Sequence, residues 1–100
     1  MLNLVMTCTS CPEQYDAYLG DTQVGYLRLR HGWFRANVPR STGKIVYQTE
    51  DIDGDGSFAT DAERDEQLAK AAEAILDELG VAVDGPSYAI GTAPKTKKEQ

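Results

Sequence analysis

The segment that most constrains the fold is Val24 to Val38, where two runs of aromatic and branched residues flank His31 and Gly32. Gly accepts the positive φ of a primed two-residue turn, so this pattern predicts a β-hairpin that turns at these two residues. The register that follows from such a turn has five cross-strand pairs. They are Arg30 with Trp33, Leu29 with Phe34, Arg28 with Arg35, Leu27 with Ala36, and Tyr26 with Asn37.

The two faces of this hairpin differ in character, because successive side chains of a strand point to opposite sides. One face is apolar and predicts a core: Leu27, Leu29, Phe34, Ala36 and Val38. The other face, which we call the arginine face, comprises Tyr26, Arg28, Arg30, Trp33 and Arg35. Arg28 opposite Arg35 is a like-charge pair that costs roughly a few tenths of a kcal/mol unless an acid or a ligand lies between them. The arginine face is therefore the candidate partner-binding surface.

The rest of the chain predicts an α+β fold, with one antiparallel sheet of about four strands in a meander and one C-terminal helix packed on one face. The first strand is expected at 14–19 and the fourth at 44–49, separated from the hairpin by turn residues at 20–21 and 39–43. We interpret residues 1–12 as a lead-in and residues 1–85 as one domain. Residues 86–100 are expected to be a flexible tail.

The one long helix is marked at both ends. Thr60 and Glu63 form a capping box at its start, and Gly80 is a suitable C′ residue at its end. Glu66 and Lys70 make a favourable i,i+4 pair. The apolar residues recur at helical spacing and are expected to pack on the apolar face of the hairpin. This stripe comprises Leu68, Ala71, Ala72, Ile75, Leu76 and Leu79.

Composition narrows the classes of function. The net charge of −6 argues against unspecific affinity for nucleic acid or anionic lipid, which carry the same sign. No stretch approaches the roughly 20 apolar residues of a membrane span, and the first six residues lack the length and basic flank of a secretory signal. We therefore expect a cytoplasmic protein that does not bind membranes. The charge is uneven, because residues 22–49 contain no acid whereas residues 50–66 contain eight acids and one base.

Part of that acidic stretch resembles a calcium loop. Asp51, Asp53, Asp55 and Gly56 match the opening of an EF-hand, in which alternating carboxylates on a tight turn supply hard oxygen ligands. The twelfth position is Ala62 where the bidentate Glu of an EF-hand is required, and a strand precedes the loop. Two interpretations follow: a calcium site with Asp51, Asp53 and Asp55 as ligands, or a solvated acidic turn without a cofactor.

Other chemistry-bearing residues do not form a recognisable catalytic pattern. Cys8 and Cys11 are spaced as in a zinc or redox motif, but His31 is the only further soft ligand and no βαβ pattern surrounds them. Two free thiols are the simpler interpretation. The chain also lacks a nucleophile elbow and a phosphate-binding glycine loop. We therefore expect a protein that is not an enzyme.

The arginine face admits three interpretations. Its arginines could hold phosphates while Trp33 or Tyr26 stacks on a base, as in a module that binds single-stranded nucleic acid. It could instead bind a protein, since Arg, Trp and Tyr dominate interface hot spots. In the third interpretation it is a solvated face whose long Arg stems cover the aromatic rings.

The pattern over residues 11–76 resembles a family of small uncharacterised phage and prophage proteins. The most specific part is Q-V-G-Y-L-R-L-R-H-G-W-F, followed by I-V-Y and G-D-G-S-F. The resemblance implies a phage setting and a sheet-plus-helix fold, and no site residues, because the family has no assigned activity. Short acidic phage proteins of this kind are often inhibitors of host defence, including anti-CRISPR proteins, which commonly occupy a nucleic-acid-binding surface. In this chain the acids from Glu50 to Glu66 could imitate a phosphate backbone there.

The leading hypothesis is thus a non-enzymatic phage or prophage accessory protein that acts in the host cytoplasm by binding a macromolecule, most readily a protein. A calcium module and a nucleic-acid-binding module are the alternatives, and the oligomeric state is open. The predicted partner-binding residues come from the hairpin and from the helix start. They are Tyr26, Arg28, Arg30, Trp33, Arg35, Asp61 and Asp65.

Overall fold

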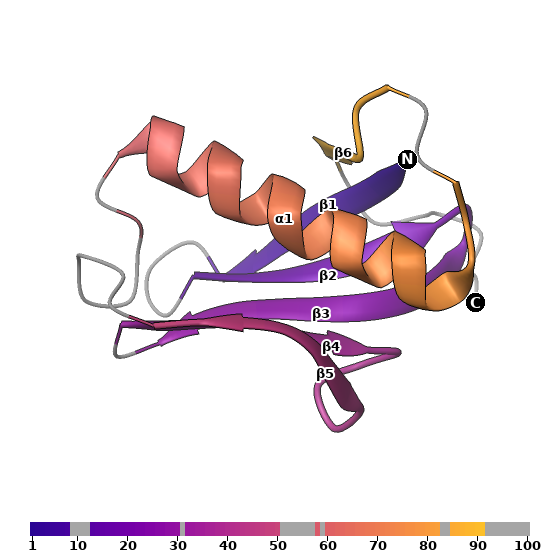
Figure 1. Cartoon of the computed structure of the whole chain (residues 1–100), viewed down its shortest axis with the longest axis horizontal. Helices are drawn as coiled ribbons and strands as arrows, with labels where there is room; N and C mark the ends of the chain where they lie inside the picture. The colour runs from indigo at the N-terminus through magenta and orange to yellow at the C-terminus, as the bar shows by residue number, and fades with distance from the viewer. Residues whose placement is uncertain (9–12, 31, 51–57, 59, 83–84, 92–100) are drawn as a thin grey trace.

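One helix crosses one face of a six-stranded sheet in the computed structural model of the chain (Figure 1). The structure describes residues 1–8, 13–30, 32–50, 58, 60–82 and 85–91. The order of strands across the sheet is β5-β4-β3-β2-β1-β6. The elements are β1 (Leu2–Cys8), β2 (Glu13–Leu19), β3 (Thr22–Arg30), β4 (Trp33–Val38), β5 (Lys44–Thr49), α1 (Asp61–Leu79) and β6 (Tyr88–Ile90).

The predicted hairpin is confirmed in its register. Strands β3 and β4 pair antiparallel with Arg30 opposite Trp33 and Arg28 opposite Arg35, and the other three pairs are also those expected. Gly32 adopts a φ of 80°, as a primed turn requires. The apolar face is the core, because Leu27, Leu29, Phe34 and Ala36 are fully buried and Val38 nearly so.

The lead-in interpretation of residues 1–12 is wrong for residues 2–8, which form β1. This strand pairs antiparallel with β2, and its side chains at Leu2 and Leu4 are fully buried. The alternation of Leu2, Leu4 and Met6 is typical of a strand. The sequence does not place this strand in the sheet, because the strands that pair with it on each side are not evident from its own residues. The meander therefore has five antiparallel strands rather than four.

The tail expected over residues 86–100 is wrong for residues 88–90, which form β6, whereas residues 92–100 lie outside the described residues. Strand β6 pairs parallel with β1, so the sheet is mixed rather than purely antiparallel. The backbone N–H of Leu2 donates to the carbonyl of Ser87 at 2.9 Å, and that of Gly91 donates to the carbonyl of Leu4 at 3.0 Å. The folded unit thus continues past residue 85, through Gly91. Three residues are too few to show a period, and β6 is recognisable only beside β1.

The helix begins and ends where its caps predict. The backbone N–H of Glu63 donates to the Thr60 hydroxyl at 3.1 Å, and Gly80 adopts a left-handed conformation. The predicted pair between Glu66 and Lys70 is present at 3.1 Å. Leu79, the last helical residue, is 40% exposed and is the one member of the predicted stripe that lies outside the core. The buried members are Leu68, Ala71, Ala72, Ile75 and Leu76.

Gly25 on β3 is a point of close approach between helix and sheet. A Cβ at this position would lie 2.7 Å from Cδ1 of Ile75 and 3.3 Å from the carbonyl oxygen of Asn37. Only a residue without a Cβ lets Ile75 pack there.

We therefore expect Gly25→Ala to destabilise the protein by about 1–3 kcal/mol through overpacking, measured by chemical denaturation. In the background of Ile75→Val, which removes Cδ1, the same substitution is expected to cost clearly less. An equal cost in both backgrounds would show that Ile75 is not the obstacle.

Candidate functional site

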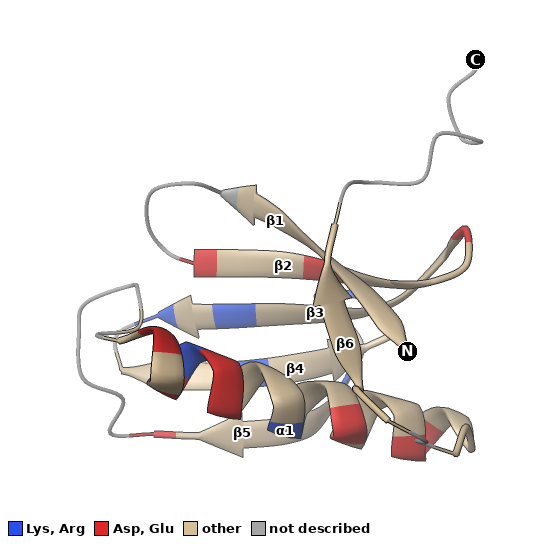
Figure 2. Cartoon of the chain, turned by 90° about the horizontal axis from the view of Figure 1, so that it is seen from above, with Lys and Arg blue, Asp and Glu red and all other residues tan. Residues whose placement is uncertain are grey.

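The arginine face lies on the side of the sheet that the helix does not cover. Its residues alternate along β3 and β4 with the buried Leu27, Leu29 and Phe34, whose side chains point toward α1. Figure 2 shows the basic segments of β3 and β4 behind a helix that carries most of the visible acids. The arginine face and the acids of the helix therefore lie on different layers, although the sheet also carries Glu13 and Asp16 and the helix Arg64 and Lys70.

A straight row of cross-strand neighbours forms the middle of this face. Gln14 pairs with Arg28, Arg28 with Arg35, and Arg35 with Gln48, so the row runs from β2 to β5. It contains two arginines, two neutral amides and no acid. Among the described residues, no carboxylate forms an ion pair with Arg28, Arg30 or Arg35. The like-charge pair predicted from the sequence is present without a neutralising group in the described part of the chain.

These side chains enclose a shallow depression of about 320 Å³. Trp33, which is 46% exposed, supplies its apolar wall. The Nε of Arg28 is buried and has no hydrogen-bond partner within the part of the chain that the structure describes. A buried donor without an acceptor costs about 1–3 kcal/mol. The lining residues are Arg28, Arg30, Trp33, Arg35 and Gln48.

Two polar residues border the depression on β2 and β3. The Tyr26 hydroxyl donates to the side-chain carbonyl of Gln14, so it is already used within the sheet. Asp16 lies opposite Tyr26 and accepts a hydrogen bond from Gln23 at 3.3 Å. Burial raises the pKa of Asp16 above its usual value. Tyr26 therefore borders the candidate site rather than lining it.

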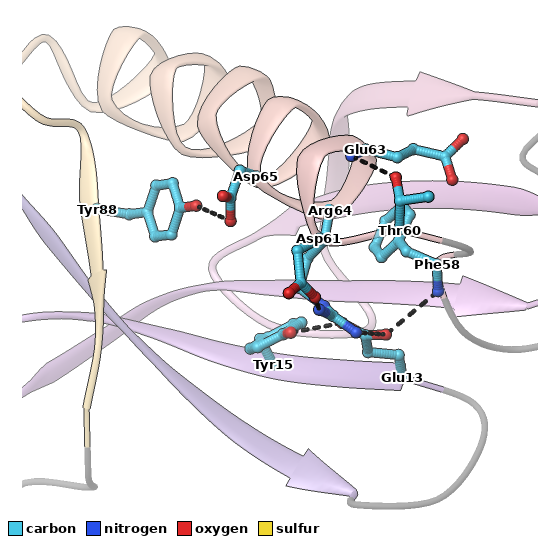
Figure 3. Close-up of polar contacts among 9 residues, drawn as sticks. All are labelled: Glu13, Tyr15, Phe58, Thr60, Asp61, Glu63, Arg64, Asp65 and Tyr88. Carbon is cyan, nitrogen blue, oxygen red and sulfur yellow. Dashed lines mark hydrogen bonds and ion pairs between the residues drawn. The ribbon is translucent and has the colours of Figure 1, made fainter.

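The two acids predicted to take part in binding lie on α1, away from the arginine face. Asp61 accepts from Nη1 of Arg64 at 2.7 Å, and Asp65 accepts from the Tyr88 hydroxyl at 3.4 Å (Figure 3). Both are exposed on the helix layer. Because the sheet separates them from the arginines, one flat partner surface cannot contact both groups.

A buried ion pair that the sequence analysis did not identify joins β2 to the start of the helix. Glu13 is 3% exposed and accepts from Nε of Arg64 at 2.7 Å, from the Tyr15 hydroxyl at 2.5 Å and from the backbone N–H of Phe58 at 3.4 Å (Figure 3). One signal could have found it. Arg64 is the only base among the acids of residues 50–66, and Glu13 shares the buried face of Tyr15.

The protonation states of this cluster are set by the ion pair. Burial alone would raise the pKa of Glu13, but the hydrogen bonds from Arg64 and Tyr15 and the charge of Arg64 hold it below its usual value. Burial and the adjacent Glu13 carboxylate raise the pKa of Tyr15. The hydrogen bond to Glu13 raises that of Arg64. A fully hydrogen-bonded, ionised carboxylate is a poor general base, so we assign this cluster a structural role.

The remaining predicted site residues fall outside the described part of the chain. These are the proposed calcium ligands Asp51, Asp53 and Asp55, together with His31 and Cys11. Among the described residues, no group of three or more His, Cys, Asp or Glu side chains is arranged to hold a metal ion. The calcium site stays a prediction. Its expected signature is heat on titration with millimolar calcium that is lost in Asp53→Asn.

Comparisons with known proteins assign no function to this site. No helix in the described part of the chain is long and apolar enough to cross a membrane. No family model, curated protein or solved structure matches the chain. The resemblance to small phage proteins therefore stays a prediction, and any function has to be argued from the site itself.

Proposed function

We propose that this protein is a non-enzymatic binding protein whose arginine face recognises an acidic surface of a protein partner. The observation that carries the proposal is the unneutralised Arg28 and Arg35 pair, with a buried Arg28 Nε that lacks an acceptor among the described residues. Holding two guanidinium groups side by side is unfavourable in the isolated chain. A partner carboxylate between them offsets this like-charge repulsion.

A protein partner is favoured over nucleic acid by the number of arginines and by composition. The three arginines of this face neutralise too few phosphates for strong binding without base contacts. Arg and Trp around one depression are also the residues most enriched at protein interface hot spots. We retain single-stranded nucleic acid as the outcome that would replace this proposal.

For the biological role, we propose a phage or prophage accessory protein that inhibits a host defence system such as CRISPR. The resemblance over residues 11–76 supports the phage setting. A binding protein without a catalytic site acts most simply by occupying a surface that its target needs. This role requires that the partner come from the bacterial host.

The test is affinity capture from a host lysate with matched charge reversals. We expect wild-type protein to capture a specific partner, Arg35→Glu to weaken the capture, and Arg28→Glu/Arg35→Glu to abolish it. Arg40→Glu is the control, because it makes the same charge change at an exposed residue outside the depression. Thermal midpoints should change little, since the reversed side chains lie outside the core.

Two outcomes would overturn the proposal. One is a captured partner that is released by nuclease treatment, which would identify nucleic acid. The other is a partner lost with Asp61→Asn/Asp65→Asn and kept with Arg28→Glu/Arg35→Glu. That result would move the binding surface to the helix start.

A further inference from the structure

The arginine face has a defined centre, and its geometry specifies the chemical group that fits there. Arg28 and Arg35 are directly opposite each other on neighbouring antiparallel strands, where Cα atoms are about 4.5–5.5 Å apart. Their neighbours in the row, Gln14 and Gln48, are neutral. The Nε of Arg28 is a donor that is already desolvated and has no acceptor in the described part of the chain. This arrangement suits one small anion at one point rather than a chain of anions.

We infer that Arg28 and Arg35 form a carboxylate-binding pocket, which holds one Asp or Glu side chain of the partner against the ring of Trp33. This inference rests on the proposed function and names the group that is recognised. A guanidinium presents parallel N–H donors that match the two oxygens of a carboxylate, and such charge-assisted pairs are the strongest hydrogen bonds in proteins.

Trp33 explains how so small a site could bind appreciably. It is the only tryptophan of the chain, and half of it is still exposed beside the arginines. The methylene stem of an acidic side chain can pack on this ring, while its carboxylate, which the negative face of the ring repels, turns toward the two guanidinium groups. The ring then shields the carboxylate from water on one side, which strengthens its attraction to both groups. The volume of about 320 Å³ suits one acidic side chain with its flanking residues.

A nucleic-acid backbone fits this centre less well. Phosphates follow one another closely along a strand, so backbone recognition needs a basic track of several residues. On the arginine face the basic residues of the described sheet lie on β3 and β4, since Lys44 on β5 pairs instead with Glu78 of the helix at 2.9 Å, and Asp16 on β2 borders them. A single carboxylate needs only the Arg28 and Arg35 pair.

Trp33 fluorescence provides a direct test with the full chain. At physiological ionic strength, we expect acetylated hexaglutamate to change the emission of Trp33 with saturation, and acetylated hexaglutamine to leave it unchanged. Arg28→Lys keeps the charge but loses Nε and the planar fork, so we expect it to weaken hexaglutamate binding about tenfold. Arg40→Lys makes the same chemical change outside the depression and should bind like wild type.

Different results would contradict the carboxylate-binding pocket and the proposed function. Hexaglutamate binding that is equal in wild type and Arg28→Lys would overturn the pocket, as would no binding at all. Saturable binding of oligothymidylate or inorganic phosphate without hexaglutamate binding would also overturn it. If a lysate partner is still lost with Arg35→Glu in any of these cases, the proposed function stands without the pocket. A circular dichroism melt of each variant verifies that it is folded.

Discussion

Replacing Arg64 by Met is expected to destabilise the protein by about 3 kcal/mol, because it leaves the Glu13 carboxylate buried without its cation. Glu13 is 3% exposed, and the side chain of Arg64 is 30% exposed. The partial exposure of Arg64 places the expected cost near the lower end of the range for a broken buried pair. Chemical denaturation of the two proteins at neutral pH measures it.

Two variants separate the ion pair from other effects of losing Arg64. Asp61→Asn removes the exposed partner of the same guanidinium and should have little effect, as is usual for a surface pair. Glu13→Gln/Arg64→Met removes the buried charge as well and should be more stable than Arg64→Met alone. If Asp61→Asn costs as much as Arg64→Met, the buried pair is not the source of the stability.

The same pair predicts how stability depends on pH. The pKa of Glu13 is lower in the folded state than its ordinary value of 4.5. The unfolded chain therefore binds more protons at acidic pH, and stability rises with pH through this range. The contribution of Glu13 should be complete above about pH 5 and lost as the pH falls through the folded pKa. Glu13→Gln should accordingly lose less stability than wild type between pH 5 and pH 3.

The second large effect is expected at the N-terminal strand. Leu4 is fully buried on β1 between β2 and β6, so we expect Leu4→Ala to cost about 2–5 kcal/mol. Leu2 is buried equally. Because small domains are stable by only about 5–15 kcal/mol, Leu2→Ala/Leu4→Ala should leave much of the protein unfolded. A thermal melt followed by circular dichroism measures both variants.

Met6→Ala is the matched control for this prediction. Met6 lies on the same strand but is 39% exposed, so its truncation should cost much less than that of Leu4. Unchanged melting of Leu4→Ala would mean that residues 2–8 contribute little to the core, as expected of a lead-in that precedes the first strand. The structure predicts the opposite, since β1 joins β6 to the rest of the sheet.

The hairpin, the meander and the helix could be predicted because each is specified by neighbouring residues. A two-residue turn with Gly32 determines every pair between β3 and β4, and alternation then assigns Leu29 and Arg28 to opposite faces. Thr60 and Gly80 cap the helix through contacts within a few residues. The arginine face is a local feature for the same reason, and its residues are next to one another as predicted.

The wrong predictions concern segments whose structure depends on residues far away in the sequence. Strand β1 pairs with β2 and with β6, which is more than 80 residues away along the chain. Leu79 matches the period of the helical stripe, but it lies on the last turn and is exposed. Periodicity identifies residues able to enter a core and does not say where the core ends.

The sequence by itself determined which side chains share a face of the hairpin, because strand alternation and turn geometry are properties of short segments. The apolar stripe of the helix also predicted that it covers the apolar face of the hairpin, but only the tertiary structure placed Asp61 and Asp65 on the opposite side of the sheet from the arginines. It also decided that Glu13 meets Arg64, 51 residues later. Long-range packing makes these choices, since it is the burial of Ile75 and Leu68 against the sheet that brings the separate segments together.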